Sequence, residues 1–250
     1  DSANGWSFKN AVQGYQSWGT VAYGIRVSAN SYLYSMVSKL DLCDISDMAN
    51  KLHLHDGLGQ QLYDPGLLSA NIGGTRYGAT PLTMASAYAT FASEGKYCEP
   101  RPLEKITKSD GSTMKTYESK CEQAISPDIA NGVSYVLKGV LASGGSAPKR
   151  AIGLPDASAA KTGTNDNSSQ TWMVGYTRGL ATASWVGSND LGYRSMNGIA
   201  INGRVLEYVD GATYAGAQWQ QFMQAMAPKY NTEKFTEPPA SVTSTNVNGK

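Results

Sequence analysis

The chain has 250 residues, which is enough to bury a substantial core in one large domain or in one domain with an appendage. Its formal net charge of +1 at pH 7, with no cluster of basic residues, argues against a nucleic-acid-binding surface. No apolar run reaches the length of a membrane span, and no signal peptide opens the sequence, which begins at Asp1.

The first predicted elements are helices. Apolar residues recur at helical spacing over residues 20–40, but Gly24 and the stretch Ser28–Asn30 interrupt them, so we expect two helices there. A short helix is predicted over residues 46–54. A longer one is predicted over residues 80–94, because Thr80 is a favourable N-cap, Pro81 suits the first turn and Gly95 follows the end.

Two strand-like runs come next, separated by the turn sequence "KSDGS", and they predict a hairpin over residues 102–118. Pairing around that turn would bring Cys98 and Cys121 together, as a disulfide requires. An extracytoplasmic location would favour this bridge, and the alternative is two unrelated thiols. Cys43 has no evident partner.

The second half of the chain mixes helices and strands. A helix with an apolar stripe begins at Ser126 and Pro127. The further predicted elements are strands over residues 158–164, 171–177 and 180–187 and a helix over residues 212–227. We expect one domain over residues 1–228, followed by a polar, flexible tail over residues 229–250. This order predicts an α+β fold with an antiparallel sheet covered by helices.

The most informative segment is "ASAAKTGTNDNSSQTWMVGYTRGLATASWVG", residues 157–187, which contains Lys161, Thr162, Gly163 and Thr164 on a predicted strand. Because side chains alternate along a strand, Lys161 and Gly163 should face one side and the two threonines the other. A lone Lys-Thr-Gly is most often a strand end with a turn glycine. In this setting it resembles the third motif of the penicillin-binding protein and serine β-lactamase family, whose motifs are S-x-x-K, S-x-N or S-D-N, and K-T-G.

The resemblance runs across nearly the whole chain. The segments "GATPLTMASAYATFASEGKY" and "AGAQWQQFMQAM" are similar to a helix before the Lys-Thr-Gly region and to the closing helix of the transpeptidase domain in class A (bifunctional) penicillin-binding proteins. The resemblance implies a fold like that of penicillin-binding proteins and serine β-lactamases, in which a five-stranded antiparallel sheet has helices on both faces.

Five Ser-x-Asn sequences compete for the second motif: Ser2–Asn4, Ser28–Asn30, Ser69–Asn71, Ser195–Asn197 and Ser244–Asn246. The family places this motif well before Lys-Thr-Gly, so the last two are excluded, whereas Ser28 precedes Lys161 by 133 positions. Only Ser28 and Asn30 also lie between two predicted helices. The alternative is a polar cap at a helix junction.

The resemblance assigns a role to each motif residue. The Ser28 hydroxyl would relay a proton, and the Asn30 amide would hold a catalytic lysine and the substrate's peptide oxygen. Lys161, Thr162 and Thr164 would bind the substrate's terminal carboxylate, with Gly163 leaving room beside it. The Thr164 N–H would form half of the oxyanion hole.

The nucleophile is missing from these motifs. It requires a serine one helical turn before a lysine at a helix start. The matches to Ser-x-x-Lys are Ser93–Lys96, Ser112–Lys115, Ser146–Lys149 and Ser158–Lys161, and none has that setting. We therefore expect the nucleophilic serine and its lysine to lie upstream of Asp1, in the preceding part of a longer polypeptide.

The resemblance implies a D,D-transpeptidase at the outer face of the cytoplasmic membrane, needing no cofactor. Its partners would be peptidoglycan stem peptides ending in D-Ala-D-Ala, and β-lactams. Two alternatives stay open: a hydrolytic D,D-carboxypeptidase or β-lactamase, and a non-catalytic module that binds the cell wall. His53 and His55 have too few neighbouring ligand residues in sequence for a metal site and read as a surface helix end.

Overall fold

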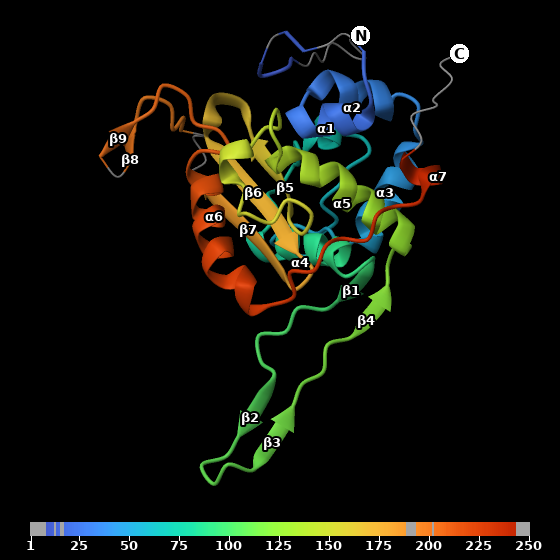
Figure 1. The fold of residues 1–250 in the computed structure, drawn as a ribbon, viewed down its shortest axis with the longest axis vertical. Helices are drawn as coiled ribbons and strands as arrows, with labels where there is room; N and C mark the ends of the chain where they lie inside the picture. The colour runs from blue at the N-terminus through green and yellow to red at the C-terminus, as the bar shows by residue number, and fades with distance from the viewer. Residues whose placement is uncertain (1–8, 13, 16–17, 189–193, 202, 244–250) are drawn as a thin grey trace.

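The computed structural model describes residues 9–12, 14–15, 18–188, 194–201 and 203–243. A small central sheet has helices on both faces, and a long two-stranded ribbon extends away from this body (Figure 1). The competing motifs at residues 2–4 and 244–246 lie outside the described residues.

The central sheet contains three antiparallel strands in the order β5 (Ala159–Thr164), β6 (Gln170–Thr177) and β7 (Leu180–Gly187). These are the three strands expected from the sequence. The expectation of five strands is wrong for the described residues, because their other short strands pair with one another in separate two-stranded ribbons. Strand β5 is therefore an edge strand.

Helices cover the sheet because alternate side chains of β6 point to opposite faces. Tyr176 packs against Tyr88 of α4 (Pro81–Ala92) and bonds to α5 (Pro127–Leu141). On the other face, Gly175 leaves room for Trp219 of α6 (Tyr214–Met226), since a Cβ at Gly175 would lie 2.6 Å from the indole. Tyr176 and Trp219 are both fully buried, so the core occupies both faces of the sheet.

The expected break within residues 20–40 is confirmed. Helix α1 (Val21–Val27) ends at Ser28, and α2 (Asn30–Val37) begins two residues later. Helix α3 (Leu42–Lys51) begins earlier than predicted, because the Asp41 carboxylate accepts a hydrogen bond from the Cys43 N–H and caps the helix there. A 3₁₀ helix, η2 (Leu68–Ile72), follows.

The predicted starts of the two longer helices in the middle of the chain are also confirmed. The Thr80 hydroxyl accepts from the Thr83 N–H at the start of α4, and Ser126 accepts from the Ile129 N–H at the start of α5. Between these helices lies the projecting ribbon, with β1 (Lys96–Cys98) paired to β4 (Cys121–Gln123) and β2 (Lys105–Thr107) paired to β3 (Thr113–Thr116).

Cys98 and Cys121 stand opposite each other in the ribbon and form a disulfide. The bridge lies at the base of the ribbon, where the two strands leave the body (Figure 1).

The remaining small elements are η3 (Pro148–Arg150), η4 (Asp166–Ser168), β8 (Ala200–Ile201), β9 (Arg204–Val205), η5 (Ala227–Lys229) and α7 (Ala240–Thr243).

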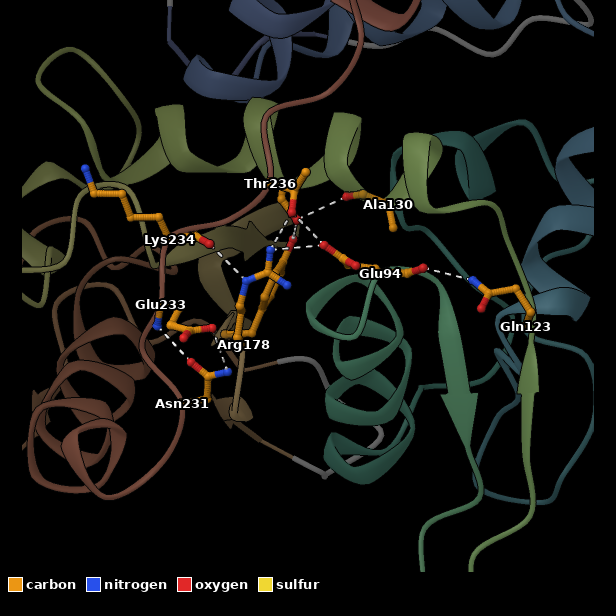
Figure 2. A network of polar contacts seen from close by, with 10 residues as sticks. Glu94, Gln123, Ala130, Arg178, Asn231, Glu233, Lys234 and Thr236 are labelled. Atoms are coloured by element: carbon orange, nitrogen blue, oxygen red, sulfur yellow. Dashed lines mark hydrogen bonds and ion pairs between the residues drawn. The ribbon is translucent and has the colours of Figure 1, made fainter.

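The segment after α6 returns across the body as far as Thr243. Phe235 is buried against Tyr176, and Glu237 pairs with Lys138 of α5. Figure 2 shows Arg178 bonded to both Glu94 and Thr236, where the turn after β6, the end of α4 and the returning segment meet. This part of the expected tail therefore contributes to the core, while the boundary at residue 228 stays a prediction.

No helix in the part of the chain that the structure describes is long and apolar enough to cross a bilayer. Nor do the described residues contain a group of three or more His, Cys, Asp and Glu placed to hold a metal ion. His53 follows the end of α3, where it stacks on Tyr97 and pairs with Glu122 at 2.9 Å.

Candidate active site

The structure brings together Ser28 and Lys161, which are 133 positions apart in sequence. The Lys161 ammonium donates a hydrogen bond to the Ser28 hydroxyl at 2.7 Å and a second to the Thr162 carbonyl at 2.9 Å. Ser28 comes from the end of α1 and Lys161 from the edge strand β5. Both elements pack on α5, so this helix is the shared support of the pair.

The backbone at Ser28 has an unusual conformation. Its φ of 58° and ψ of 44° lie in the left-handed region, which non-glycine residues seldom adopt. This conformation ends α1, and the next residue, Ala29, is fully buried. Such backbone strain concentrates at functional sites, where the surrounding packing maintains it.

Lys161 has no carboxylate partner among the ion pairs of the described residues. Burial of its ammonium group lowers the pKa of Lys161 to about 8. The physical cause is desolvation, which disfavours the charged form. Lys161 can therefore change protonation state close to neutral pH, and its positive charge is available to an anionic ligand.

Asn30 lies at the first position of α2, but its side chain makes a different contact from the one expected. Its amide donates to the Lys9 carbonyl at 2.7 Å, and among the described residues no hydrogen bond joins it to Ser28 or Lys161. The structure thus unites two of the three expected catalytic residues and leaves Asn30 beside the N-terminal segment.

The remaining motif residues each contact a different segment of the chain. The hydroxyl of Thr162 is hydrogen-bonded to that of Ser146 at 2.9 Å. The hydroxyl of Thr164 accepts from the Gly211 N–H at 2.9 Å, in the loop before α6. Gly163 is paired across the strands with Trp172 of β6, where a Cβ would come within 3.2 Å of the tryptophan Cβ.

The four Ser-x-x-Lys matches occupy unrelated places. Ser93 bonds backbone carbonyls at the end of α4, and Ser112 bonds Asp110 at the tip of the ribbon. Ser158 is buried and donates to the Leu154 carbonyl. Ser146 alone lies beside the motif residues, but its hydroxyl is bonded to Thr162. None of them stands at the start of an α-helix with its lysine one turn later.

The other Ser-x-Asn candidates that the structure describes have local roles. Ser69 lies in η2 and donates to the Gly74 carbonyl, while Ser195 accepts from the Asn197 N–H two residues later. Sequence reasoning missed Ser146 and Gly211 as neighbours of the Lys-Thr-Gly strand. Gly144 and Gly145 before Ser146, and the glycine at position 211 itself, were the available signal, since close backbone approach often requires glycine.

Known proteins are similar to this chain in sequence and in fold. Residues 1–233 match the family described as "Penicillin binding protein transpeptidase domain". The chain is 25% identical over 231 residues to penicillin-binding protein 1A of Aquifex aeolicus, which covers 92% of this chain and 29% of that protein. It is 31% identical over 186 residues to penicillin-binding protein 1A of Mycolicibacterium smegmatis, covering 68% of this chain and 23% of that protein.

Solved structures extend the similarity to the fold. Penicillin-binding protein PonA1 from Mycobacterium tuberculosis aligns with a TM-score of 0.78 at 24% identity, over 95% of this chain and 63% of that one. PonA1 in complex with penicillin V aligns with a TM-score of 0.67 at 25% identity, over 88% of this chain and 59% of that one. The chain spans less than a third of the length of the two curated relatives. It belongs to the penicillin-binding protein transpeptidase domain family.

Proposed function

We propose that this chain forms the part of a peptidoglycan D,D-transpeptidase that carries the Ser-x-Asn and Lys-Thr-Gly motifs. The observation that carries the proposal is the 2.7 Å hydrogen bond between the Lys161 ammonium and the Ser28 hydroxyl. Serine acyl transfer to an anionic substrate can use such a pair, in which the hydroxyl passes a proton and the cation binds the anionic group.

In the proposed reaction, a serine hydroxyl attacks the carbonyl of the D-Ala–D-Ala peptide bond. The serine loses its proton, the C–N bond breaks, and D-Ala leaves after its amine has gained a proton through Ser28. The amine of a second stem peptide then attacks the acyl-enzyme, and the serine recovers a proton as the new peptide bond forms. β-Lactams would acylate the same serine, since PonA1 is described in complex with penicillin V.

We assign the nucleophilic serine to a segment outside this chain. The support is that none of the Ser-x-x-Lys matches within it has a serine at the start of an α-helix beside Lys161. The lysine that activates the nucleophile belongs to the same segment. In this proposal Asn30 turns from the Lys9 carbonyl toward the substrate once that segment is in place.

Substrate binding is proposed at the free edge of β5. An edge strand offers unpaired backbone groups to an extended peptide, which the stem peptide would use. Lys161 would bind the terminal carboxylate, together with the hydroxyls of Thr162 and Thr164, and Gly163 would leave room for the ligand. The Thr164 N–H would supply one donor of the oxyanion hole.

We also place this domain outside the cytoplasm, on the outer face of the cytoplasmic membrane. The disulfide between Cys98 and Cys121 supports this location, because such bridges persist in oxidising compartments.

Labelling of the full-length protein with a fluorescent penicillin tests the proposed function. We expect a covalent adduct with the wild type and greatly reduced labelling of the Ser28→Ala and Lys161→Ala variants. If the wild type forms no covalent adduct under conditions in which a known transpeptidase is labelled, the assignment is refuted. Incubation with a stem pentapeptide and an acceptor amine then separates transpeptidation from hydrolysis, since a carboxypeptidase yields only the shortened peptide. A non-catalytic module would show neither product.

A further inference from the structure

Ser146 contacts both segments that carry the Ser28–Lys161 pair. Its N–H donates to the Arg26 carbonyl at 2.9 Å, two residues before Ser28. Its hydroxyl is bonded to the Thr162 hydroxyl at 2.9 Å, one residue after Lys161. Ser146 therefore lies at the edge of β5 and joins this strand to the end of α1.

The loop that carries Ser146 is itself held in place. It follows α5, and the Ala147 N–H donates back to the Val140 carbonyl at 3.0 Å. The Arg26 guanidinium donates to the Ser143 carbonyl. Gly145 packs so closely on α5 that a Cβ there would lie 2.3 Å from the Val140 carbonyl oxygen. The loop is therefore a fixed support, and the position of Ser146 is determined by α5 and α1.

We propose that Ser146 is a positioning residue that holds the Ser28 hydroxyl against the Lys161 ammonium. This inference rests on the proposed function, in which Ser28 and Lys161 act in acyl transfer. Ser146 also belongs to a Ser-x-x-Lys match with Lys149, but Lys149 is exposed on η3 and has no hydrogen bond to Ser146. The role assigned to Ser146 is thus to align Ser28 with Lys161, and Ser146 is not the nucleophile.

A positioning role affects the rate of the chemical step more than ligand binding, because misaligned reacting groups raise the barrier of that step. Removal of the Ser146 hydroxyl breaks its bond to Thr162 and loosens β5 relative to α1. We expect the acylation rate constant of Ser146→Ala to fall about tenfold. The dissociation constant of the non-covalent penicillin complex should change by less than about twofold, since the Lys161 charge is retained.

Stopped-flow acylation of the full-length protein by a fluorescent penicillin measures both constants. Ser146→Thr keeps the hydroxyl and should restore most of the rate. Ser143→Ala, in the same loop, removes an exposed hydroxyl and should match the wild type. Thr162→Val removes the same hydrogen bond from the other side and should also lower the acylation rate constant, but unlike Ser146→Ala it should raise the dissociation constant as well, because Thr162 is a proposed carboxylate ligand.

Three results would overturn the inference. The first is an unchanged acylation rate constant in folded Ser146→Ala, and the second is an equal loss in Ser143→Ala. The third is the complete absence of a covalent adduct in folded Ser146→Ala at long times, which would make Ser146 the nucleophile. If Ser146→Ala does not fold, an unchanged rate in Thr162→Val refutes the inference. Failure of the wild type to form any adduct counts instead against the proposed function.

Discussion

Lys161 illustrates how the surroundings of a single residue set its chemistry. Its ammonium donates to the Ser28 hydroxyl and the Thr162 carbonyl, but neither partner carries a negative charge. Desolvation therefore dominates, and the pKa of Lys161 falls to about 8. A lysine of this kind binds an anion only while it remains protonated.

We predict that the affinity for a carboxylate-bearing penicillin decreases as the pH rises through about 8, because the free protein loses the Lys161 charge there. Lys161→Arg should retain its affinity up to pH 10, since an arginine stays protonated. Competition binding at a series of pH values measures this. Equal pH profiles for the wild type and Lys161→Arg would contradict the prediction.

The same depressed pKa affects folding. The unfolded chain keeps its Lys161 proton up to the ordinary value of 10.5, whereas the folded protein releases it near 8. The unfolded state then binds more protons in this interval, so the contribution of Lys161 makes the free energy of unfolding rise with pH between about 8 and 10.5.

Thr164 depends on a glycine far along the chain. The Gly211 N–H donates to the Thr164 hydroxyl, which leaves the hydroxyl proton free for a ligand. A Cβ at Gly211 would lie 2.4 Å from the Trp172 carbonyl oxygen and 2.7 Å from that of Gly163. A side chain here must therefore displace the end of β5.

We predict that Gly211→Ala lowers the second-order rate constant of penicillin acylation about tenfold, because the displaced strand weakens the proposed carboxylate site. The loss should be larger for a penicillin than for its methyl ester, which lacks the carboxylate. Gly57→Ala is the control, since a Cβ there meets only ordinary contact, 3.7 Å from Thr80. An equal loss with the acid and the ester would show that the carboxylate is not involved.

At the scale of elements, one carboxylate links three segments. Glu94, directly after α4, accepts from the Thr236 hydroxyl at 2.7 Å and from Arg178 at 3.0 Å (Figure 2). These hydrogen bonds hold the pKa of Glu94 below its ordinary value, and the bond from Thr236 has the larger effect. Arg178 also donates to the Lys234 carbonyl, so Glu94 helps to hold the returning segment against the sheet.

We predict that Glu94→Gln lowers the free energy of unfolding at pH 7 by about 1 kcal/mol, a value reduced for the partial exposure of the pair. The folded pKa of Glu94 is lowered, so the stabilisation is present above the ordinary value of 4.5 and is lost as the pH falls below it. Urea unfolding at pH 7 and pH 3 measures the difference. Glu118→Gln, on an exposed residue of the ribbon, should change neither value, and a difference that persists at pH 3 would contradict the mechanism.

At the scale of the whole molecule, α5 connects the sheet to the helices that carry Ser28. Ser134 of α5 is buried and bonded to the Tyr176 hydroxyl at 2.8 Å, and it also donates to the Ala130 carbonyl. The two partners are therefore not equivalent. Ser134 keeps a second partner if the bond is lost, whereas the Tyr176 hydroxyl has no second hydrogen bond within the part of the chain that the structure describes.

We predict that Tyr176→Phe costs about 1 kcal/mol of stability and that Ser134→Ala costs about 2 kcal/mol. The physical reason is that Ser134→Ala leaves a buried tyrosine hydroxyl unsatisfied, whereas Tyr176→Phe removes the hydroxyl itself. Thermal and urea unfolding of both variants compare the costs. The reverse order would indicate that water or a neighbouring group satisfies the Tyr176 hydroxyl.

Local patterns account for what could be predicted about the fold. Thr80 and Ser126 are helix caps whose hydroxyls bond the backbone three residues later, so a short sequence window contains the whole signal. The start of α3 was missed although apolar residues recur at helical spacing directly after the Asp41 cap, at Leu42, Ile45 and Met48. The returning segment was also underestimated, since the burial of Phe235 depends on Tyr176, which is distant in sequence.

In the candidate site, too, the local features were predictable from the sequence and the long-range contacts were not. The Lys-Thr-Gly strand and the helix break at Ser28 were predictable from residue order, because each belongs to one continuous segment. The contact of Asn30 with Lys9, and that of Ser146 with Thr162, were not. Hydroxyl and amide groups have many possible partners, and only the packing of helices against the sheet selects among them.

By itself, the sequence determined the longer helices and the central strands of this protein, the family it resembles and the order of its motifs, since caps, turns and periodicity act over a few residues. The tertiary structure alone decided that the Ser28 hydroxyl meets the Lys161 ammonium, 133 positions away, and that Ser146 joins their segments. It also decided the burial that lowers the pKa of Lys161 to about 8. Distance and desolvation depend on the packing of α1, α5 and β5 together, and no single segment encodes them.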